Sequence, residues 1–324
     1  MTAVLVLSQA DVIGLLDMEG CIAAMEEALR SLARGEVHLP LRPVVRPPGE
    51  STFLGLMPVF RGGERPVYAL KTVAVAPENA ARGLDPHQGT VTLFDGVTGQ
   101  TLALMNASAV TSIRTAACSA VATRALARED ATELAIVGSG HQAHAHVSAM
   151  LAVRDFQRVR IASRSREHAA ALADGFPNAE ASATVEEAVR GADVVVTATS
   201  SPEPVVERAW LKAGVHVNAV GACFPHTREL DTGTVADSRF FVDRRESAEN
   251  EAGDFLIPLH EGAIEHRHIR AELGEVLVGS APGRTSPEEI TVFKSLGLAI
   301  EDLYAAEYVV RRAEETGTGT TVEF

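Results

Sequence analysis

LAIVGSGHQA, residues 134–143, passes from an apolar run directly into two glycines and an alanine. The run 134–137 is typical of a buried strand, and GSGHQA fits the GxGxxA fingerprint of a dinucleotide-binding turn. In such a turn Gly138 permits a tight bend, Gly140 lets the backbone approach a pyrophosphate, and Ala143 lets the next helix pack closely. Because the glycines follow a predicted strand and open a predicted helix, we expect this turn to bind a dinucleotide.

The residues expected to contact the dinucleotide phosphates lie in and just after this turn. Backbone N–H groups at the start of a helix have no partner within the helix, so they bind anions readily. The candidate contacts are Gly138, Ser139, Gly140, His141 and Gln142.

Further apolar runs place the turn in a larger sheet. Short strands are predicted at residues 159–162, 194–197 and 215–220, separated by Ala-rich helical segments. Strands that alternate with helices indicate βαβ units and a parallel sheet covered on both faces. The predicted fold class is therefore α/β, with a Rossmann-type parallel sheet.

The end of the second strand predicts which dinucleotide is bound. A cofactor with a free 2′-hydroxyl is usually met by Asp or Glu about 20 residues after the glycine turn. This sequence instead has Ser163, Arg164, Ser165 and Arg166. A guanidinium can bind a 2′-phosphate through two hydrogen bonds, whereas an acid would repel it. We therefore expect NADP(H) to be preferred over NAD(H), unless the two arginines only form the solvated start of a helix.

Composition and charge argue against several classes of protein. The 324 residues carry 29 Lys+Arg against 43 Asp+Glu, a net charge of −14, and 5% aromatic residues. Nucleic-acid binding uses clustered basic residues, which this sequence lacks. Its N-terminal apolar stretch is far shorter than the roughly 20 residues of a spanning helix, and no signal peptide is expected. Three cysteines, Cys21, Cys118 and Cys223, without metal-ligand spacing favour a reducing, cytoplasmic location.

The flanking segments have a different texture. Ser8, with Asp11 three residues later, is expected to cap a first helix. The other predicted elements are helices at 17–35 and 110–128, strands at 4–7, 52–57, 67–75 and 90–94, a turn at 95–99, and a last helix at 290–312. The three histidines His141, His144 and His146 are not expected to bind metal, because no carboxylate or cysteine completes a ligand set.

Eight motifs spread over nearly the whole chain share one pattern. They are HLPLRPVV (38–45), LGLMP (54–58), ALKTV (69–73), HQGTVTLFDGVTGQTLALM (87–105), TSIRTAA (111–117), GSGHQA (138–143), NAVGACFPHTRELD (218–231) and ITVFKSLGLAIED (290–302). Together they resemble the ornithine cyclodeaminase/mu-crystallin family. The resemblance implies an NADP(H)-binding Rossmann domain, residues 118–299, and an α+β domain from both chain ends, residues 1–117 and 300–324. The second domain would bind substrate and form a homodimer.

The same resemblance implies a small α-amino or α-imino acid substrate whose carboxylate is held by basic side chains. The matching positions are Arg42, Lys71 and Arg114. Three cations on separate motifs of an acidic protein would form a local anion site, and arginine offers a planar fork to a carboxylate. The alternative for each cation is an ion pair at the protein surface.

Further residues are implied near the nicotinamide. His87 is a candidate proton donor near pH 7, or else a structural histidine at a strand entrance. Cys223 is either a small wall of the pocket or a weak proton donor. Motif position alone adds possible cofactor contacts, whose alternative is ordinary packing, at Gln88, Thr115, Thr199, Ser200, Val220 and Ser295.

Three positions distinguish this sequence from the cyclodeaminases it resembles. Those enzymes carry Glu, Asp and Asp where this sequence has Gly55, Cys223 and Lys294. Cyclodeamination needs a carboxylate that accepts protons while ammonia leaves, and we expect no acidic side chain beside the predicted cations. The three changes resemble instead the mu-crystallin side of the family, whose members reduce cyclic ketimines with a nicotinamide cofactor.

The predicted function is NADPH-dependent reduction of a cyclic ketimine carboxylate to the cyclic L-amino acid. Candidate substrates are Δ1-pyrroline-2-carboxylate, which gives proline, and Δ1-piperideine-2-carboxylate. Arg42 and Arg114 would clamp the carboxylate, while Lys71 would contact it or relay a proton. The alternatives are an ornithine cyclodeaminase, an alanine-dehydrogenase-like amino acid oxidoreductase, and a protein that binds NADPH and a ligand without turnover.

Overall fold

The computed structural model describes residues 3–85 and 87–323. The chain forms two compact units: unit 1 comprises Met1–Arg114 and Leu298–Phe324, and unit 2 comprises Thr115–Gly297. The domain boundaries implied by the resemblance lie three residues further along the chain at the first boundary and two at the second.

Unit 1 is built on a sheet in which all strand pairs but one are antiparallel. The strand order is β16-β1-β7-β6-β5-β4-β2, with β3 also paired to β4, and β1 pairs with β7 in parallel. The strands are β1 (Ala3–Leu7), β2 (Val37–His38), β3 (Val44–Val45), β4 (Phe53–Arg61), β5 (Val67–Val75), β6 (His87–Asp95), β7 (Thr101–Asn106) and β16 (Thr320–Glu323). Because β16 pairs with β1, both ends of the chain belong to this sheet.

The first two helices of unit 1 begin at residues whose side chains cap them. Ser8 and Asp11 form the predicted capping box of α1, and Asp17 caps α2. Gly317, with a φ of 68°, ends α11. The helical segments are α1 (Gln9–Leu15), α2 (Met18–Ala33), η1 (Pro77–Arg82) and α11 (Ala299–Thr316), and α3 (Ala107–Leu126) begins in unit 1 and continues into unit 2.

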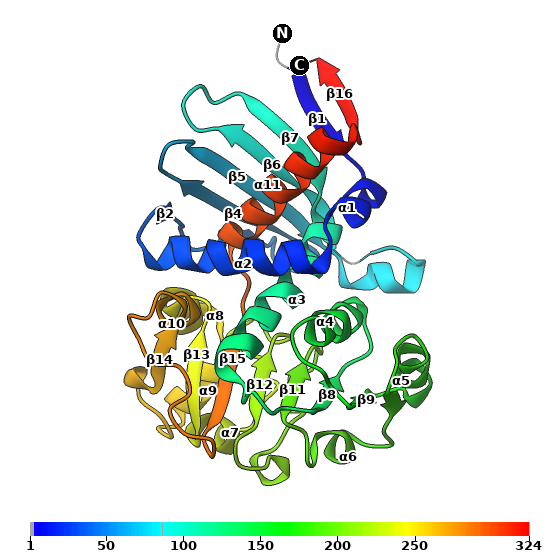
Figure 1. The fold of residues 1–324 in the computed structure, drawn as a ribbon, viewed down its shortest axis with the longest axis vertical. Helices are drawn as coiled ribbons and strands as arrows, with labels where there is room; N and C mark the ends of the chain where they lie inside the picture. Colours follow the sequence, from blue (N-terminus) through cyan, green and yellow to red (C-terminus); the bar gives the residue numbers. More distant parts are fainter. Residues whose placement is uncertain (1–2, 86, 324) are drawn as a thin grey trace. The chain divides into compact units, whose positions relative to one another are not determined.

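Helix α11 lies across the central strands of this sheet (Figure 1) and packs against α2. Alternate residues of β5 therefore differ in burial: Ala69 and Lys71 are each 3% exposed, whereas Tyr68 is 48% exposed on the opposite face. This alternation is expected of a strand that has one face buried.

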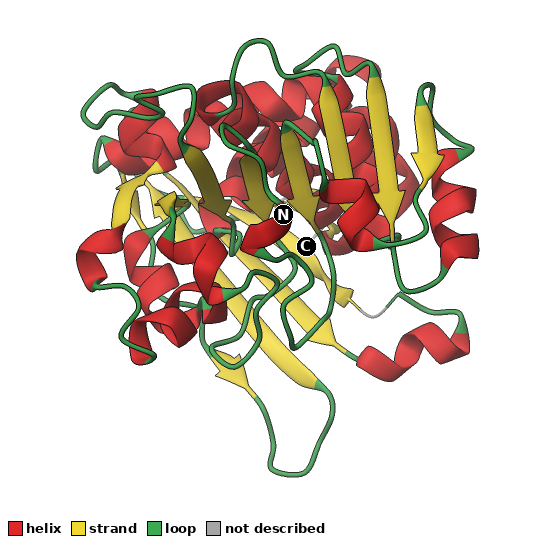
Figure 2. Cartoon of the chain, turned by 90° about the horizontal axis from the view of Figure 1, so that it is seen from below, coloured by secondary structure: helices red, strands yellow, loops and turns green. Residues whose placement is uncertain are grey.

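Unit 2 is a parallel sheet of order β10-β9-β8-β11-β12-β15-β13-β14. Figure 2 shows strands lying side by side with helices packed along them. The strands are β8 (Glu133–Val137), β9 (Arg158–Ala162), β10 (Ala179–Ala181), β11 (Val194–Thr197), β12 (His216–Ala219), β13 (Ser238–Val242), β14 (Ile269–Glu272) and β15 (Ile290–Lys294). Every pair in this sheet is parallel, so the predicted α/β class with a Rossmann-type sheet is confirmed.

Short helices connect these strands. They are α4 (His141–Leu151), α5 (Arg166–Ala173), α6 (Val185–Val189), η2 (Arg208–Trp210), α7 (Thr232–Ala236), α8 (Arg245–Glu251), α9 (Gly253–His260), η3 (His266–His268) and α10 (Leu273–Leu277). Their apolar faces and the sheet bury a core of Val, Ala, Leu and Phe side chains. Within 3–85 and 87–323, no helix has the length and apolar character needed to cross a membrane.

The helix predicted over residues 290–312 is wrong in its first part. Ile290–Lys294 is a fully buried strand between β12 and β13, and the helix begins only at Ala299. The run is short and rich in β-branched and aromatic residues, which favour a strand. Gly297, with a φ of 78°, then separates the strand from the helix.

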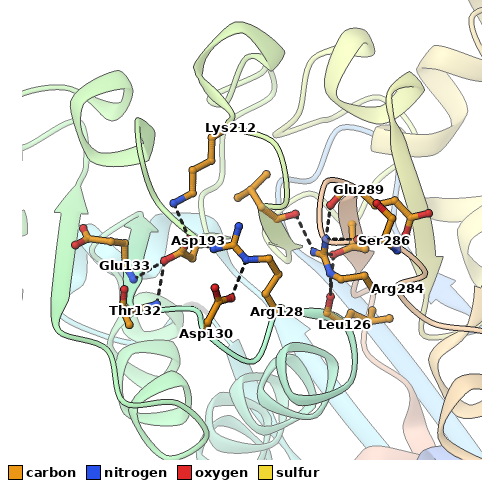
Figure 3. Close-up of polar contacts among 12 residues, drawn as sticks. Leu126, Arg128, Asp130, Thr132, Glu133, Asp193, Lys212, Arg284, Ser286 and Glu289 are labelled. Carbon is orange, nitrogen blue, oxygen red and sulfur yellow. Dashed lines mark hydrogen bonds and ion pairs between the residues drawn. The ribbon is translucent and has the colours of Figure 1, made fainter.

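Two charged residues tie together the amino ends of the strands in unit 2 (Figure 3). Asp193 accepts the backbone N–H groups of Thr132 and Glu133 at 2.9 and 3.0 Å and pairs with Arg128 at 2.9 Å. Arg284 donates to the backbone carbonyls of Leu126, Val215, Ser286 and Glu289. Because these contacts lie at the edge opposite to the strands' carboxyl ends, we interpret them as structural.

Candidate active site

The predicted strand, glycine turn and helix are all present in unit 2. Gly138 has a φ of 128°, and a Cβ on it would lie 2.5 Å from the carbonyl oxygen of Ala198. Gly140 is the N-cap of α4, and a Cβ there would meet no atom within 4 Å. Ala143 is fully buried. The turn therefore leaves the start of an 11-residue helix open to a pyrophosphate, as dinucleotide binding requires.

The three histidines after this turn differ in burial and in their contacts. His146 is buried, with Nε2 3.0 Å from Ser119 Oγ and Nδ1 2.7 Å from the carbonyl oxygen of Gln142. Burial lowers the pKa of His146 to about 4, so the ring is neutral near pH 7. His141 and His144 are exposed. Among the described residues, no group of three or more His, Cys, Asp or Glu side chains could hold a metal ion.

The segment after β9 carries the predicted determinant of cofactor choice. Ser165 caps α5 and accepts the His168 N–H at 3.2 Å, while the Ser163 hydroxyl donates to the Ser165 carbonyl at 2.7 Å. These bonds shape the turn and leave Arg164 and Arg166 exposed. The turn therefore presents two guanidinium groups and no carboxylate at the end of the second strand.

The cofactor candidates of unit 2 gather at one edge of the sheet. In the order β10-β9-β8-β11-β12-β15, the chain runs from β8 through β9 to β10 on one side and then returns to the other side of β8 with β11. The position between β8 and β11 is therefore a topological switch point. Ligands of open parallel sheets bind beside the carboxyl ends of strands at such a point. The candidates that follow these strand ends are Ser163 after β9, Gly138 after β8, Thr199 and Ser200 after β11, Val220 after β12, and Ser295 after β15. Thr115 does not follow a strand of this sheet: it is a residue of α3 and is 8% exposed.

Unit 1 holds a buried cluster of four charged side chains, Lys71, Arg114, Glu301 and Asp302. Arg114 Nε lies 2.9 Å from Asp302 Oδ1, and Arg114 Nη1 lies 2.6 Å from Glu301 Oε2. Lys71 Nζ lies 2.8 Å from Asp302 Oδ2 and 3.3 Å from the hydroxyl of Thr111. Each charged side chain is at most 4% exposed. The structure therefore brings two of the three predicted substrate-binding cations together.

The prediction that no acidic side chain lies beside these cations is wrong. The first turn of α11 places Glu301 and Asp302 against Lys71 and Arg114. A surface ion pair does not describe the contacts either, because all four groups are buried. Burying an unpaired charge costs several kcal/mol, so two cations in this position require carboxylate partners.

The environment of Lys71 suits proton transfer. Burial, followed by the positive charge of Arg114, lowers the pKa of Lys71 to about 8, although the charge of Asp302 opposes this shift. A lysine with such a pKa is mostly protonated at pH 7 yet gives up its proton far more readily than an exposed lysine.

Arg42 is half-buried and lies just before β3. The carbonyl of the next residue, Pro43, accepts the Leu56 N–H at 2.9 Å, and Met57 pairs with Lys71 across β4 and β5. Arg42 and Lys71 therefore lie on opposite sides of β4, at about the same level along the strands. At the usual strand spacing, their backbones are roughly 10 Å apart.

His87 does not lie beside Lys71 in unit 1. It opens β6 opposite Val75, four residue pairs from Lys71, or about 13 Å along the strand. Its side chain is 55% exposed, and its backbone N–H donates to Asp85 Oδ1 at 2.8 Å. Gln88 Nε2 donates to the carbonyl of the same Asp85 at 3.0 Å. The roles of His87 as proton donor and of Gln88 as cofactor contact stay predictions.

Cys223 follows β12 in unit 2 and is half-buried, with Sγ 3.5 Å from the carbonyl oxygen of Val220. Both of its predicted roles, pocket wall and weak proton donor, remain open. Lys294, which replaces an acid of the cyclodeaminases, is fully buried and pairs with Asp254 at 3.0 Å.

The interpretation of the sequence missed the carboxylates that organise both units. Glu301 and Asp302 end the quoted motif ITVFKSLGLAIED, and Glu229 lies in NAVGACFPHTRELD. The available signal was the position of each acid among apolar neighbours. Acids in such a position are rarely buried without a partner, so each one indicates a paired internal charge.

Comparison with known proteins agrees with these observations. The model of the ornithine cyclodeaminase/mu-crystallin family matches residues 2–317. The chain belongs to this family. A Δ1-pyrroline-2-carboxylate reductase of Bacillus cereus is 39% identical over 327 residues, covering 99% of this chain and 100% of the relative.

Two solved structures of family members have the same fold. The Δ1-pyrroline-2-carboxylate reductase of Thermococcus litoralis, in complex with NADH and L-proline, has a TM-score of 0.94 and 37% identity, covering 98% of this chain and 100% of that chain. An archaeal alanine dehydrogenase dimer with bound NAD has a TM-score of 0.94 and 33% identity over 100% of both chains. The resemblance found in the sequence is confirmed, and the chain is an oxidoreductase that uses a nicotinamide dinucleotide.

Proposed function

We propose that this member of the family reduces a cyclic ketimine carboxylate to the corresponding cyclic L-amino acid with NADPH. The observation that carries the proposal is the buried contact of Lys71 and Arg114 with Asp302 in unit 1. It places a guanidinium, which can bind the carboxylate of the substrate, near a lysine of lowered pKa, which can donate a proton to the imine nitrogen. The similar reductases of Bacillus cereus and Thermococcus litoralis support the same substrate class.

In this mechanism Arg42 and Arg114 bind the substrate carboxylate. Glu301 and Asp302 accept hydrogen bonds from Arg114 and so restrict the orientation of its guanidinium. Such prior orientation lowers the entropy lost when substrate binds.

Lys71 supplies the proton of the reaction. When the substrate arrives as a neutral imine, the ring nitrogen takes a proton from Lys71 Nζ. A reduced nicotinamide, when bound, would supply hydride to the imine carbon. The electron pair of the C=N bond moves to nitrogen, and the product is a secondary amine. Asp302, 2.8 Å from Lys71 Nζ, keeps the protonated lysine in place before the transfer.

Cyclodeamination is less well supported than imine reduction. Both carboxylate oxygens of Asp302 already contact cations, Oδ1 with Arg114 and Oδ2 with Lys71. Gly55, Cys223 and Lys294 occupy the three positions at which the cyclodeaminases carry acids, so no carboxylate is supplied there.

Oxidation of NADPH by Δ1-pyrroline-2-carboxylate and by Δ1-piperideine-2-carboxylate, followed by its absorbance, tests this proposal. We expect turnover with at least one of the two imines. Conversion of L-ornithine to proline with release of ammonia would favour cyclodeamination. Oxidation of NADPH with pyruvate only when ammonia is present would favour the alanine dehydrogenase activity of the similar archaeal protein. NADPH binding without oxidation by any substrate would indicate a non-catalytic binding protein.

The preference for NADPH rests on the two exposed arginines after β9 and on the absence of an acid at residues 163–166. Both similar structures hold NAD or NADH, so the preference needs its own test. We expect Arg164→Asp to weaken NADPH binding at least tenfold, because it removes a charge-assisted contact worth roughly 1.5–3 kcal/mol and adds repulsion. NADH binding should change little.

Titration calorimetry with each cofactor measures this difference, and Arg158→Asp is a matched control. Arg158 is an exposed arginine that pairs with Glu180. It is the first residue of β9, whereas the turn with Arg164 follows the last residue of that strand. Tighter binding of NADH than NADPH by the parent protein would contradict the preference.

We also propose that two copies of the chain associate through the face of the unit 1 sheet opposite α11. That face carries a hollow of about 410 Å³, and the residues that line it include Pro58, Phe60, Tyr68, Leu70 and Phe94. An exposed apolar sheet face is a common site of association. The dimer of the archaeal alanine dehydrogenase supports the association of two copies.

A further inference from the structure

Glu229 is a fully buried carboxylate of unit 2 that takes no part in the proposed chemistry. Its Oε1 accepts hydrogen bonds from the backbone N–H and the hydroxyl of Thr199, at 2.7 and 2.8 Å. Its Oε2 accepts the Gly221 N–H at 2.6 Å and the Thr197 hydroxyl at 2.8 Å. Four donors therefore converge on one side chain.

The two backbone donors belong to different turns. Thr199 follows the end of β11, and Gly221 follows the end of β12, the neighbouring parallel strand. The turns are in close contact, because a Cβ on Gly221 would lie 2.0 Å from the carbonyl oxygen of Thr199 and 2.5 Å from Glu229 Oε1. Glu229 thus joins the two turns through one hydrogen bond to the backbone of each.

Two further buried charged residues, Asp254 and Lys294, position the backbone of Glu229. Asp254 Oδ1 accepts the backbone N–H groups of Glu229 and Leu230 at 2.8 and 3.0 Å. Asp254 Oδ2 lies 3.0 Å from Lys294 Nζ, and both side chains are fully buried. Lys294 stands at the end of β15, the next strand of the sheet after β12. Its single positive charge balances one of the two carboxylate charges in this buried region.

The geometry requires at position 229 a side chain whose two terminal oxygens both accept hydrogen bonds. Each oxygen faces a backbone N–H, which can only donate. A glutamine has nearly the same shape, but whichever way its amide is turned, the NH₂ group meets one of these N–H donors. Glutamine must therefore release one of the two turns.

We propose that Glu229 is a positioning residue for dinucleotide binding, which sets the spacing of the turns after β11 and β12. These turns carry Thr199, Ser200 and Val220, the candidate cofactor contacts at the centre of the sheet edge. Asp254 and Lys294 keep the segment that carries Glu229 in place. This inference rests on the proposed function, since it requires the cofactor to bind at this edge.

A purely structural role would have a different signature. The hydroxyl of Thr197 bonds to the same carboxylate at 2.8 Å, but Thr197 is a residue of β11 itself and belongs to neither turn. Thr197→Val removes a buried hydrogen bond while both turns stay attached to Glu229. It is therefore the matched control for Glu229→Gln.

The experiment compares the full-length parent with Glu229→Gln and Thr197→Val. Urea unfolding measures stability, titration calorimetry measures the Kd for NADPH, and hydrogen exchange monitors residues 198–201 and 220–223. We expect both variants to lower the urea midpoint. Only Glu229→Gln should speed exchange in the two turns and raise the Kd at least tenfold, while Thr197→Val stays within twofold of the parent. The KM for the imine in Glu229→Gln should remain within twofold when NADPH is saturating.

Equal cofactor affinity in Glu229→Gln and the parent would overturn the inference and leave the proposed function intact. Unchanged exchange in the two turns would also overturn it. If the parent binds neither NADPH nor NADH, the proposed function fails first. Should Glu229→Gln not fold, Gly221→Ala tests the same spacing with the carboxylate intact. Its added Cβ must push the turns apart, so an unchanged Kd in that variant would count against the inference.

Discussion

Lys71 is a cation whose properties depend on what surrounds it. It lies in the middle of β5, where an ordinary lysine would be costly to bury, and Asp302 offsets part of that cost. The same burial lowers the pKa of Lys71 to about 8. One residue can therefore remain charged in the interior at neutral pH and still donate a proton to a substrate.

Asp302→Asn should move the pH dependence of the reaction. The charge of Asp302 raises the pKa of Lys71, so its loss lowers that pKa further below about 8. Because protonated Lys71 is the active form, the alkaline fall of kcat/KM should shift to lower pH by about one unit or more. Thr111→Val removes an uncharged neighbour of Lys71 and should shift the profile much less. Identical profiles for Asp302→Asn and the parent would contradict the assignment of Lys71.

Arg114→Ala should damage both stability and substrate binding. It leaves Glu301 and Asp302 buried without their guanidinium partner, which costs about 3–5 kcal/mol of unfolding free energy. We also expect the KM for the imine to rise at least tenfold. Arg82→Ala is the control, because the side chains of the Arg82–Glu78 pair are 66% and 70% exposed and should contribute almost nothing. Urea unfolding and steady-state kinetics measure the two effects, and equal stability of the two variants would contradict this account.

The strands of unit 2 position the cofactor candidates because they all run in the same direction. All strands are parallel, so each strand end delivers its following residues to the same edge of the sheet. The glycine turn after β8 lies beside Ala198, which follows β11, and this proximity is possible only without a side chain on Gly138.

Gly138→Ala should impair both the fold and cofactor binding. The added Cβ would lie 2.5 Å from the carbonyl oxygen of Ala198, and a φ of 128° is strained for alanine. We expect a clear loss of unfolding free energy and no measurable NADPH binding. In Gly14→Ala the new Cβ meets no atom within 4 Å on helix α1, so stability should rise by about 0.5–1 kcal/mol. Unaltered NADPH binding in Gly138→Ala would refute the role of the turn.

At the scale of the whole molecule, the main feature is an exposed apolar surface on the unit 1 sheet, where burial by a partner would be favourable. Tyr68 is 48% exposed beside Phe60, with ring centroids 4.6 Å apart, on the face of the unit 1 sheet opposite α11. Leu70 and Phe94 line the same hollow. In water such a surface favours association with an equally apolar partner, and a second copy provides one.

Tyr68→Lys should therefore convert a dimer into single chains. We expect the parent to sediment at about twice the 34.3 kDa of one chain and the variant at that mass itself, because a charge would be buried in the contact. Val97→Lys is the matched control: Val97 is an apolar residue, 78% exposed, outside the lining of the hollow. Sedimentation velocity separates the outcomes, and a dimeric Tyr68→Lys variant would exclude this face as the interface.

The amino-acid sequence alone determined the α/β class, the glycine turn and the family. These features depend on local patterns: a strand, two glycines and a helix start lie within ten residues of one another, and each motif is continuous in the chain. The boundary between β15 and α11 was harder to predict from the sequence. A short apolar run has no periodicity that separates a buried strand from a buried helix, and only its place between β12 and β13 decides it.

The tertiary structure decided which charges meet. Arg114 and Asp302 are 188 residues apart in the chain, and Thr197 and Glu229 are 32 apart, yet each pair shares a buried hydrogen bond. No local pattern encodes such a contact, because it exists only after the sheet and α11 have packed and water has left. Once water is excluded, it no longer solvates the buried cations and backbone N–H groups. The buried carboxylates take its place as their hydrogen-bond and ion-pair partners.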